Sequence, residues 1–357
     1  MNKRSRALVI LTPAFAADES DSRLPSQESL VRHFNRLYPS IEIIVLTFHF
    51  PIRQHKTYTW HGNKVITFSS DMKGKLHSLL LWKKVWQELS GLRKAYELTG
   101  ILSFFCSECA FIGHYFSRRH GLTHKIWVLG QDARKNNPQV RRIKPRPEEL
   151  VVISDFLQRE FETNHGIRPA HIIPIGIDPT LIPPAATQRD IHLLGAGSLI
   201  PLKQYDQFVA VTGIVAEQYP GLRSVLLGNG PQDAILQQQI SSSQLSLFLT
   251  MPGKQTREET LAYMQRCKVF LHTSAYEGLG MVCLEAVYAG AQVISFCKPL
   301  DLRIEQWHVV NNKEEMAAKA LELLQSSATS YNSDLPYRME DTAIRLMQFF
   351  AQDVPAL

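Results

Sequence analysis

Short apolar runs recur along the first half of the chain, separated by polar stretches and by segments with helical periodicity. The runs lie at 7–12, 41–47, 101–105, 125–129, 150–154 and 171–174. Their positions are apolar consecutively rather than alternately, which is typical of strands buried on both faces of a parallel sheet. Amphipathic segments between them predict helices at 27–37, 76–98 and 155–164. This order of elements predicts a doubly wound α/β domain.

A second alternation of the same kind begins near Asp190. Apolar runs predict strands at 191–196, 224–228, 269–273 and 291–295. Amphipathic segments predict helices at 204–219, 231–239, 257–266, 284–289, 313–325 and 341–352. The second half therefore predicts another doubly wound domain.

The two alternations divide the chain into predicted domains. We expect a first domain over 1–178, a linker over 179–189 that contains Pro179, Pro183 and Pro184, and a second domain over 190–335. A last helix over 336–357 is expected to pack back on the first domain. Two such domains are expected to face a central cleft, with ligands at the carboxyl ends of the strands.

Composition agrees with a globular protein. The chain has 357 residues, of which 45% are hydrophobic and 20% charged, so it can bury substantial cores. Its apolar runs are shorter than the ~18 residues of a membrane span, and its start lacks the pattern of a signal peptide. We therefore expect the protein in the cytoplasm.

Five cysteines are too few and too unevenly spaced for a disulfide framework. Cys106 and Cys109 have the spacing of half a zinc site, but no second pair of suitable ligands follows. We favour buried thiols at a junction between strand and helix, and expect no metal or other cofactor.

The charge is distributed unevenly. Residues 1–178 hold 26 Lys and Arg against 16 Asp and Glu, a net charge of +10, whereas the whole chain carries +6. The densest basic run is 134–146. It is either a solvated loop or a surface for an anionic partner such as lipid headgroups. Nucleic acid is not expected, because the basic run lacks interleaved aromatic residues.

The most informative segment runs from Glu277 to Glu285. Two carboxylates lie eight residues apart and flank Gly278, Leu279 and Gly280. Glycines let a ligand approach the backbone, and free N–H groups at the start of a helix bind phosphate oxygens. Taken alone, this pattern equally fits a turn followed by a solvated glutamate.

The surrounding segments resemble glycosyltransferase family 4, whose members are retaining enzymes of the two-domain GT-B fold. The family's Glu-Gly-Phe-Gly segment with a second Glu is matched at 277–285. Its Gly-Arg-Leu loop ending in Lys resembles 197–203, its Gly-Asp-Gly-Pro turn resembles 228–231, and its Ile-Pro-Asn-Gly-Val-Asp segment resembles 173–178. The resemblance covers nearly the whole chain and is densest from 150 to 295.

The resemblance implies a role for each matched position. Lys203 neutralises the donor diphosphate, Glu277 holds hydroxyls of the transferred sugar, and Glu285 holds the ribose. The remaining donor-site residues are Gly197, Ser198, Gly228, Gly230, Gly278, Leu279 and Gly280. On the acceptor side we expect Gln131, Asp132 and Arg134. The expected catalytic residues are Glu277, Lys203 and Asp132. Such enzymes need no metal, so cationic groups stabilise the departing nucleotide diphosphate.

The chain departs from the family pattern in three places. Ser198 stands where an Arg that binds the diphosphate is usual, and Leu129 stands where a His is usual. Pro13 and Ala14 follow the first strand in place of a Gly pair, and the loop over 18–26 is expected to face the acceptor. Arg257 and Lys254 are candidates to replace the missing Arg. His272 either touches the ligand or is a satisfied structural histidine, and Ser154 is expected to cap a helix.

The expected function is transfer of a sugar from a nucleotide-diphosphate sugar to a hydroxyl of a glycan or lipid-linked acceptor. The basic first half favours an acceptor at an anionic membrane surface, as in bacterial surface polysaccharide synthesis. The departures at Ser198 and Leu129 leave open a non-catalytic subunit that only binds the nucleotide sugar. A dinucleotide-dependent dehydrogenase is disfavoured, because the first strand is not followed by the glycine fingerprint of that class.

Overall fold

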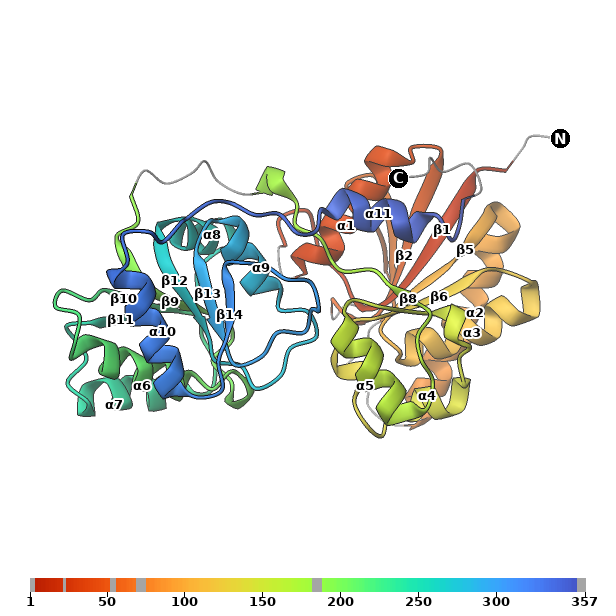
Figure 1. Cartoon of the computed structure of the whole chain (residues 1–357). Coiled ribbons are helices and arrows are strands. Elements are labelled where there is room, and N and C mark those ends of the chain that lie inside the picture. Colours follow the sequence, from red (N-terminus) through yellow and green to blue (C-terminus); the bar gives the residue numbers. More distant parts are fainter. Residues whose placement is uncertain (1–3, 22–23, 52–55, 69–74, 182–187, 352–357) are drawn as a thin grey trace. The chain divides into compact units, whose positions relative to one another are not determined.

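A computed structural model describes residues 4–21, 24–51, 56–68, 75–181 and 188–351. The chain forms two compact units (Figure 1). Unit 1 comprises Met1–Gly176 together with Tyr337–Leu357, and unit 2 comprises Ile177–Pro336. The predicted linker over 179–189 is described only in part. A short 3-10 turn covers Pro179–Leu181, and residues 182–187 lie outside the described part.

Unit 1 is built on a sheet of eight strands. The strands are β1 (Arg6–Ala14), β2 (Ile41–Phe50), β3 (Lys56–Trp60), β4 (Asn63–Thr67), β5 (Glu97–Phe104), β6 (His124–Val128), β7 (Leu150–Val152) and β8 (His171–Ile172). The helices are α1 (Pro25–Leu37), α2 (Lys75–Ala95), α3 (Glu108–His120), α4 (Pro138–Ile143), α5 (Asp155–His165) and α11 (Met339–Met347).

The strand order of this sheet is β3-β4-β2-β1-β5-β6-β7-β8. All neighbouring pairs are parallel except β3 and β4, which form an antiparallel hairpin at the edge. The chain leaves β1 toward β2 on one side and returns to β5 on the other side. The order therefore reverses between β1 and β5, which is the switch point of a doubly wound sheet.

Helices cover both faces of this sheet. On one face, α2 and α3 bury Leu81, Val85 and Ile112 against β1, β2 and β4. On the other face, α1 lies beside α11, the last described helix, as Figure 1 shows. Thr342 of α11 accepts a hydrogen bond from the N–H of Gly176 (3.0 Å) and donates one to the carbonyl of Pro174 (2.8 Å). These contacts make α11 an integral part of unit 1.

Unit 2 is built on a sheet of six parallel strands. The strands are β9 (Ile191–Ala196), β10 (Ser224–Leu227), β11 (Leu249–Gly253), β12 (Cys267–His272), β13 (Gln292–Ser295) and β14 (Trp307–Val309). The helices are α6 (Tyr205–Ala216), α7 (Asp233–Ser242), α8 (Arg257–Arg266), α9 (Met281–Tyr288) and α10 (Lys313–Gln325).

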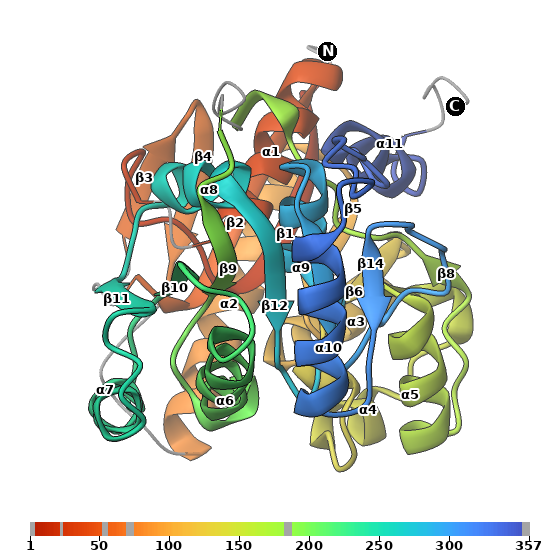
Figure 2. The ribbon, with the colours of Figure 1, turned by 60° about the vertical axis from the view of Figure 1, so that its left-hand side comes forward.

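The strand order of unit 2 is β11-β10-β9-β12-β13-β14, the arrangement of a dinucleotide-binding fold. Its core on one face joins α6, α7 and α10 to the sheet through buried residues such as Phe208, Leu236 and Met316. Figures 1 and 2 show α8 and α9 on the opposite face. Both units are thus doubly wound, and the α/β fold class predicted from the sequence is confirmed.

Several elements differ from the predictions. The hairpin β3–β4, strands β11 and β14, and helices α3 and α4 are not predicted from the sequence. The hairpin lies at the edge of its sheet. Half-exposed strands there alternate between apolar and polar residues and lack a continuous apolar run. The predicted helix over 341–352 begins two residues earlier and ends at Met347, and Gln352 lies outside the described residues. The basic run 134–146 is not a loop throughout, because α4 occupies its centre with Asn137 as N-cap.

Gly176 provides a test of how tightly α11 is held. A Cβ atom there would lie 2.2 Å from the carbonyl oxygen of Arg338, within the backbone itself. We expect Gly176→Ala to lower the free energy of unfolding of the protein by about 2 kcal/mol or more, because the backbone must move to relieve the overlap. Urea unfolding followed by circular dichroism measures the change.

Gly91 is the matched control, since it is exposed on α2 and an added methyl group would meet nothing within 4 Å. We expect Gly91→Ala to raise stability by about 0.5–1 kcal/mol through helix propensity. Equal effects of the two substitutions would contradict the packing described for α11.

Candidate functional site

The candidate site lies in unit 2, where β9 and β12 run side by side. The two strands are parallel and adjacent, yet their connections leave toward opposite sides of the sheet. Loops at the carboxyl ends of such strands diverge and leave space for a ligand. The loop after β9 carries Gly197 to Lys203, and the loop after β12 carries Thr273 to Gly280. Two segments that are distant in sequence therefore meet at one edge of the sheet.

Three glycines let the loops after β9 and β10 lie directly on one another. A Cβ at Gly228 would be 1.9 Å from the carbonyl oxygen of Gly197, and one at Gly230 would be 2.5 Å from that of Leu199. Hydrogen bonds tie the same loops together, with the N–H of Leu199 donating to Asn229 O at 3.0 Å. Gly197 itself (φ +154°) sits over the buried Tyr205 hydroxyl, which would be 2.6 Å from an added Cβ. Larger residues at these positions would separate the loops.

Lys203, His272 and Glu277 form the charged centre of the site. The Lys203 ammonium donates a hydrogen bond to Glu277 Oε1. The same oxygen lies 2.9 Å from Nε2 of His272, which must carry the hydrogen toward the carboxylate. The Thr273 hydroxyl donates to the carbonyl of Lys203 at 2.7 Å and so joins the two loops. The sequence predicted Lys203 and Glu277 as site residues, and the structure brings them into direct contact.

The ion pair controls the charge state of Glu277. Burial favours the neutral acid and raises the pKa of Glu277, but the hydrogen bond from His272 and the charge of Lys203 outweigh it. The net pKa falls to about 2, so the carboxylate is ionised at neutral pH. Its side chain is 16% exposed and that of Lys203 is 20% exposed. Both charges thus remain within reach of a ligand at the strand ends.

Helix α9 starts directly after this cluster. Gly280 precedes it with φ +75°, a left-handed conformation, and a Cβ there would press on the Trp307 ring at 3.0 Å. Trp307 is fixed in turn by donating from Nε1 to the Ser295 hydroxyl at 2.7 Å. The first N–H groups of a helix lack intrahelical acceptors and bind anions. Trp307 is not predicted from the sequence, because its contact with Gly280 is tertiary and no local pattern marks it.

Glu285, one helix turn further into α9, is held by Arg257 of α8. The Arg257 guanidinium lies 2.7 Å from Glu285 Oε1, and the two side chains are 24% and 11% exposed. Burial raises the pKa of Glu285, and Arg257 only partly offsets it. Arg257 thus stands beside a predicted donor-site carboxylate. Lys254, the other candidate replacement for the missing Arg, is exposed.

The remaining predicted donor-site residues lie on the same loops. Ser198 is exposed after β9, Gly278 is partly buried, and Leu279 is 3% exposed with its side chain in the core. The structure therefore brings the predicted donor-site positions onto neighbouring loops and onto α9. Their roles toward a ligand stay predictions.

In unit 1, Asp132 is buried rather than being an exposed loop acid. One carboxylate oxygen accepts from the N–H of Cys106 at 2.8 Å, and the other accepts from Gly130 at 2.9 Å and Leu129 at 3.2 Å. Burial raises the pKa of Asp132, and these backbone hydrogen bonds partly offset the effect. Both oxygens thus organise the loops after β5 and β6, which is a structural task separate from the predicted catalytic one.

Its neighbours Gln131 and Arg134 are exposed on the same loop. Of the predicted acceptor loop over 18–26, residues 22–23 lie outside the described part of the chain. Ser154 caps α5 as predicted, accepting from the N–H of Leu157 at 3.2 Å. Cys106 and Cys109 are both 1% exposed where β5 leads into α3, and burial raises the pKa of each thiol.

Unit 2 matches a known protein family. Residues 184–333 match the family "Glycosyl transferases group 1". This match covers nearly all of unit 2 and none of unit 1.

Curated relatives match over part of their length. The chain is 29% identical over 113 residues to the phosphatidylinositol N-acetylglucosaminyltransferase gpi3 subunit of Schizosaccharomyces pombe, covering 32% of this chain and 25% of that protein. It is 24% identical over 147 residues to the UDP-N-acetylglucosamine–peptide N-acetylglucosaminyltransferase GtfA subunit of Streptococcus pneumoniae, covering 41% and 29%. The matched region thus spans about a quarter of the length of these relatives.

Solved structures resemble the chain over nearly its whole length. Sucrose-phosphate synthase from Thermosynechococcus elongatus has a TM-score of 0.69 at 16% identity, covering 98% of this chain and 99% of that one. Anabaena HepE in complex with UDP and glucose has a TM-score of 0.65 at 16% identity, covering 96% and 95%. The likeness shows the fold: both units are the Rossmann-like units of GT-B proteins.

The ion pair of Glu277 predicts a dependence of stability on pH. Because its pKa in the folded protein is about 2, against 4.5 for the free side chain, the carboxylate stabilises the fold above about pH 4.5. This contribution is lost as the pH falls from 4.5 toward 2. We expect Glu277→Gln to lower the unfolding free energy by about 1–3 kcal/mol at pH 6 and by much less at pH 3.

Urea titrations of both proteins at the two pH values measure the difference. Glu217→Gln is the matched control, because Glu217 is exposed at the far end of α6. A loss for Glu277→Gln that is the same at pH 6 and pH 3 would show that the pair is not ionic.

Proposed function

We propose that the protein is a glycosyltransferase that moves a sugar from a nucleotide-diphosphate donor to a hydroxyl acceptor. The contact of Lys203 with Glu277 at the carboxyl ends of β9 and β12 carries the proposal. A diphosphate placed there meets the Lys203 ammonium and the start of α9. A sugar beside it meets a carboxylate that accepts hydrogen bonds from hydroxyls. The match of residues 184–333 to glycosyl transferases group 1 supports the same function.

N-acetylglucosamine is the sugar that the relatives favour. The S. pombe and human phosphatidylinositol enzymes, the bacterial peptide enzymes and the 2-deoxystreptamine enzyme of Niallia circulans are all named as N-acetylglucosaminyltransferases. Their named acceptors differ widely, from a lipid to a peptide to an aminocyclitol. We therefore propose UDP-N-acetylglucosamine as the donor. For the acceptor we propose only a hydroxyl of a glycan or of a lipid-linked molecule.

Electrostatic stabilisation is the proposed source of catalysis. Negative charge develops on the leaving diphosphate, and in this proposal Lys203 and the N–H groups at the start of α9 stabilise it. Donor binding has to draw Lys203 at least partly from Glu277 toward the phosphates. The carboxylate then becomes free to accept hydrogen bonds from sugar hydroxyls. In this proposal the acceptor oxygen bonds to the sugar carbon on the face from which the diphosphate leaves, while the bond from that carbon to the phosphate oxygen breaks. The leaving phosphate oxygen takes the proton of the acceptor hydroxyl, so the configuration is retained without a protein nucleophile.

A second candidate is a subunit that binds the nucleotide sugar without transferring it. Ser198 favours this alternative, because an exposed neutral hydroxyl stands where a guanidinium is usual. Arg257 supplies a cation nearby, but its guanidinium is engaged by Glu285. The two candidates differ in one observable, the release of free nucleotide.

The donor is tested by incubating the full chain with UDP-N-acetylglucosamine, UDP-glucose, GDP-mannose and ADP-glucose and measuring nucleotide release. We expect UDP release with UDP-N-acetylglucosamine and a loss of at least about 100-fold for Glu277→Ala, because the group that orients the sugar and balances Lys203 is removed. Lys203→Met is expected to lose activity to a similar extent.

Glu217→Ala is the control and is expected to retain full activity, since its side chain is exposed at the far end of α6. Tight binding of UDP-N-acetylglucosamine without release, also in the presence of lipid extract, would favour the non-catalytic subunit. Failure to bind any of the four donors would contradict both candidates.

We further propose that unit 1 approaches an anionic membrane through α2 and α3. Leu79 and Leu80 are 57% and 49% exposed, and the aromatic side chains of both helices line a pocket of about 370 Å³. The pocket residues are Trp82, Lys83, Trp86, Phe111, Ile112 and Tyr115. Aromatic residues with adjacent lysines are typical of surfaces that bind at lipid headgroups. Within the described residues, each helix is too short or too polar to cross a membrane.

Vesicle sedimentation tests this surface. We expect the protein to bind vesicles containing phosphatidylglycerol more strongly than neutral vesicles, with a several-fold loss for the double substitution Leu79→Ser and Leu80→Ser. Ile235→Ser with Leu247→Ser is the matched control, because these residues are 62% and 92% exposed in unit 2. An equal loss in both double variants would point to general hydrophobicity instead of this surface.

A further inference from the structure

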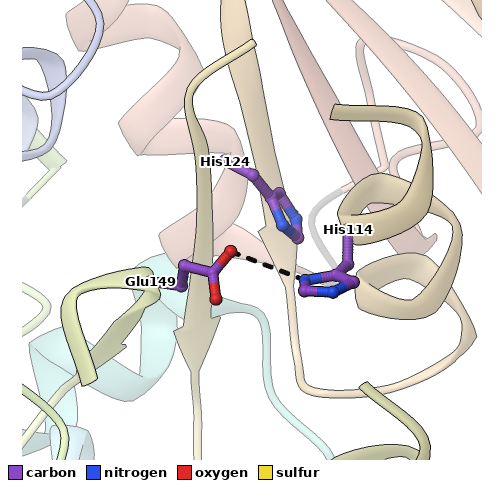
Figure 3. A group of neighbouring side chains, drawn as sticks. All are labelled: His114, His124 and Glu149. Atoms are coloured by element: carbon purple, nitrogen blue, oxygen red, sulfur yellow. Dashed lines mark ion pairs between the residues drawn. The ribbon is translucent and has the colours of Figure 1, made fainter. Parts of the chain in front are cut away.

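Three buried side chains of unit 1 converge where α3 meets the sheet. They are His114 of α3, His124 at the start of β6, and Glu149 directly before β7 (Figure 3). The two imidazoles and the carboxylate point toward one another, and one ligand atom from each lies within 4.8 Å of the others. Their residues are only 2%, 6% and 7% exposed.

Two nitrogens of this cluster have no hydrogen-bond partner in the described part of the chain. They are Nδ1 of His114 and Nδ1 of His124. The His114 nitrogen faces Glu149 Oε1 at 3.5 Å, which is long for a hydrogen bond. Buried polar atoms are almost always paired, because an unpaired one costs about 1–3 kcal/mol. Two such nitrogens beside one carboxylate indicate a missing partner.

Neighbouring groups orient the ring of His124 within the cluster. His124 Nε2 lies 2.9 Å from the Ser103 hydroxyl, which fixes the ring and leaves Nδ1 as the nitrogen available to the cluster. Gly113 permits this approach, since a Cβ there would be 2.7 Å from His124 Nε2.

Glu149 is held in place from its other oxygen. The backbone N–H of Arg146 donates to Oε2 at 2.7 Å, leaving Oε1 directed at His114. Metals bind imidazole in its neutral form, so two such rings and one carboxylate present a single negative charge to a bound ion. Such a set suits a divalent transition metal, and zinc accepts the combination of two His and one Glu.

We propose that His114, His124 and Glu149 bind a zinc ion that stabilises unit 1. Tetrahedral zinc with bonds of about 2.1 Å needs ligand atoms about 3.4 Å apart. The three atoms, which now lie within 4.8 Å of one another, must therefore close in around the ion, with a water as fourth ligand. His124 and Glu149 lie at the amino ends of β6 and β7, the edge of the sheet opposite to that where ligands of this fold bind. The role is therefore structural: the ion ties α3 to two strands. The proposed zinc site does not involve the donor site in unit 2.

Metal content and stability test the proposal on the full chain. We expect protein purified from zinc-supplemented culture to retain about one zinc per chain after dialysis. Zinc chloride added to metal-free protein is expected to raise Tm by about 5 °C, whereas magnesium chloride has no effect. Glu149→Gln and His124→Gln are expected to abolish both the retained zinc and the rise in Tm.

His61→Gln is the control, because His61 lies in the β3–β4 turn and is more exposed. It is expected to bind zinc like the native chain. Cobalt substitution identifies the ligands, since a thiolate-to-cobalt absorption band would assign the metal to Cys106 or Cys109 and overturn the proposal. It is equally overturned if the native chain holds no zinc and its Tm does not respond, or if both variants keep the metal. Should His124→Gln fail to fold, Glu149→Gln and the native titration decide.

Discussion

The parallel pairing of β9 with β12 is the constraint on which the site of unit 2 depends. Val269 of β12 lies opposite Leu193 of β9, and this register brings the ends of the two strands to the same level. Because the chain then leaves in opposite directions, Lys203 and Glu277 meet although 74 residues separate them. The apolar core that packs against both strands fixes this geometry. The positions of Lys203 and Glu277 therefore depend on packing by other residues.

Each carboxylate of the candidate site is already matched by a cation. Glu277 is balanced by Lys203, and Glu285 by Arg257. Partly buried charges left unpaired would be costly, so the pairs stabilise the site without a ligand. In the proposed function, a donor with its own negative charges competes for the same cations. Binding and release of the nucleotide diphosphate then exchange the partners of Lys203 and Arg257 rather than create new charge contacts.

The two edges of the sheet in unit 1 serve different tasks. At the carboxyl edge, Asp132 uses both oxygens to organise the loops that follow β5 and β6. At the amino edge, His114, His124 and Glu149 are buried together against α3. The polar groups of the first set are satisfied by backbone N–H groups, whereas two nitrogens of the second, within the described residues, are not. Asp132 therefore has its hydrogen bonds within the protein, whereas the proposed zinc ion would supply the partner of the two histidine nitrogens.

The sequence by itself determined the alternation of strands and helices and the positions of Lys203 and Glu277. Continuous apolar runs indicate strands buried on two faces, and glycines indicate close approach of the backbone. Both signals lie in consecutive residues, so the sequence shows them directly. The edge hairpin β3–β4 was not predicted, because edge strands lack such runs. Only the tertiary structure decided that Arg257 faces Glu285, that Asp132 is buried, and that His114 meets His124 and Glu149. These contacts join residues on separate elements, and their geometry follows from how the elements pack rather than from any spacing along the chain.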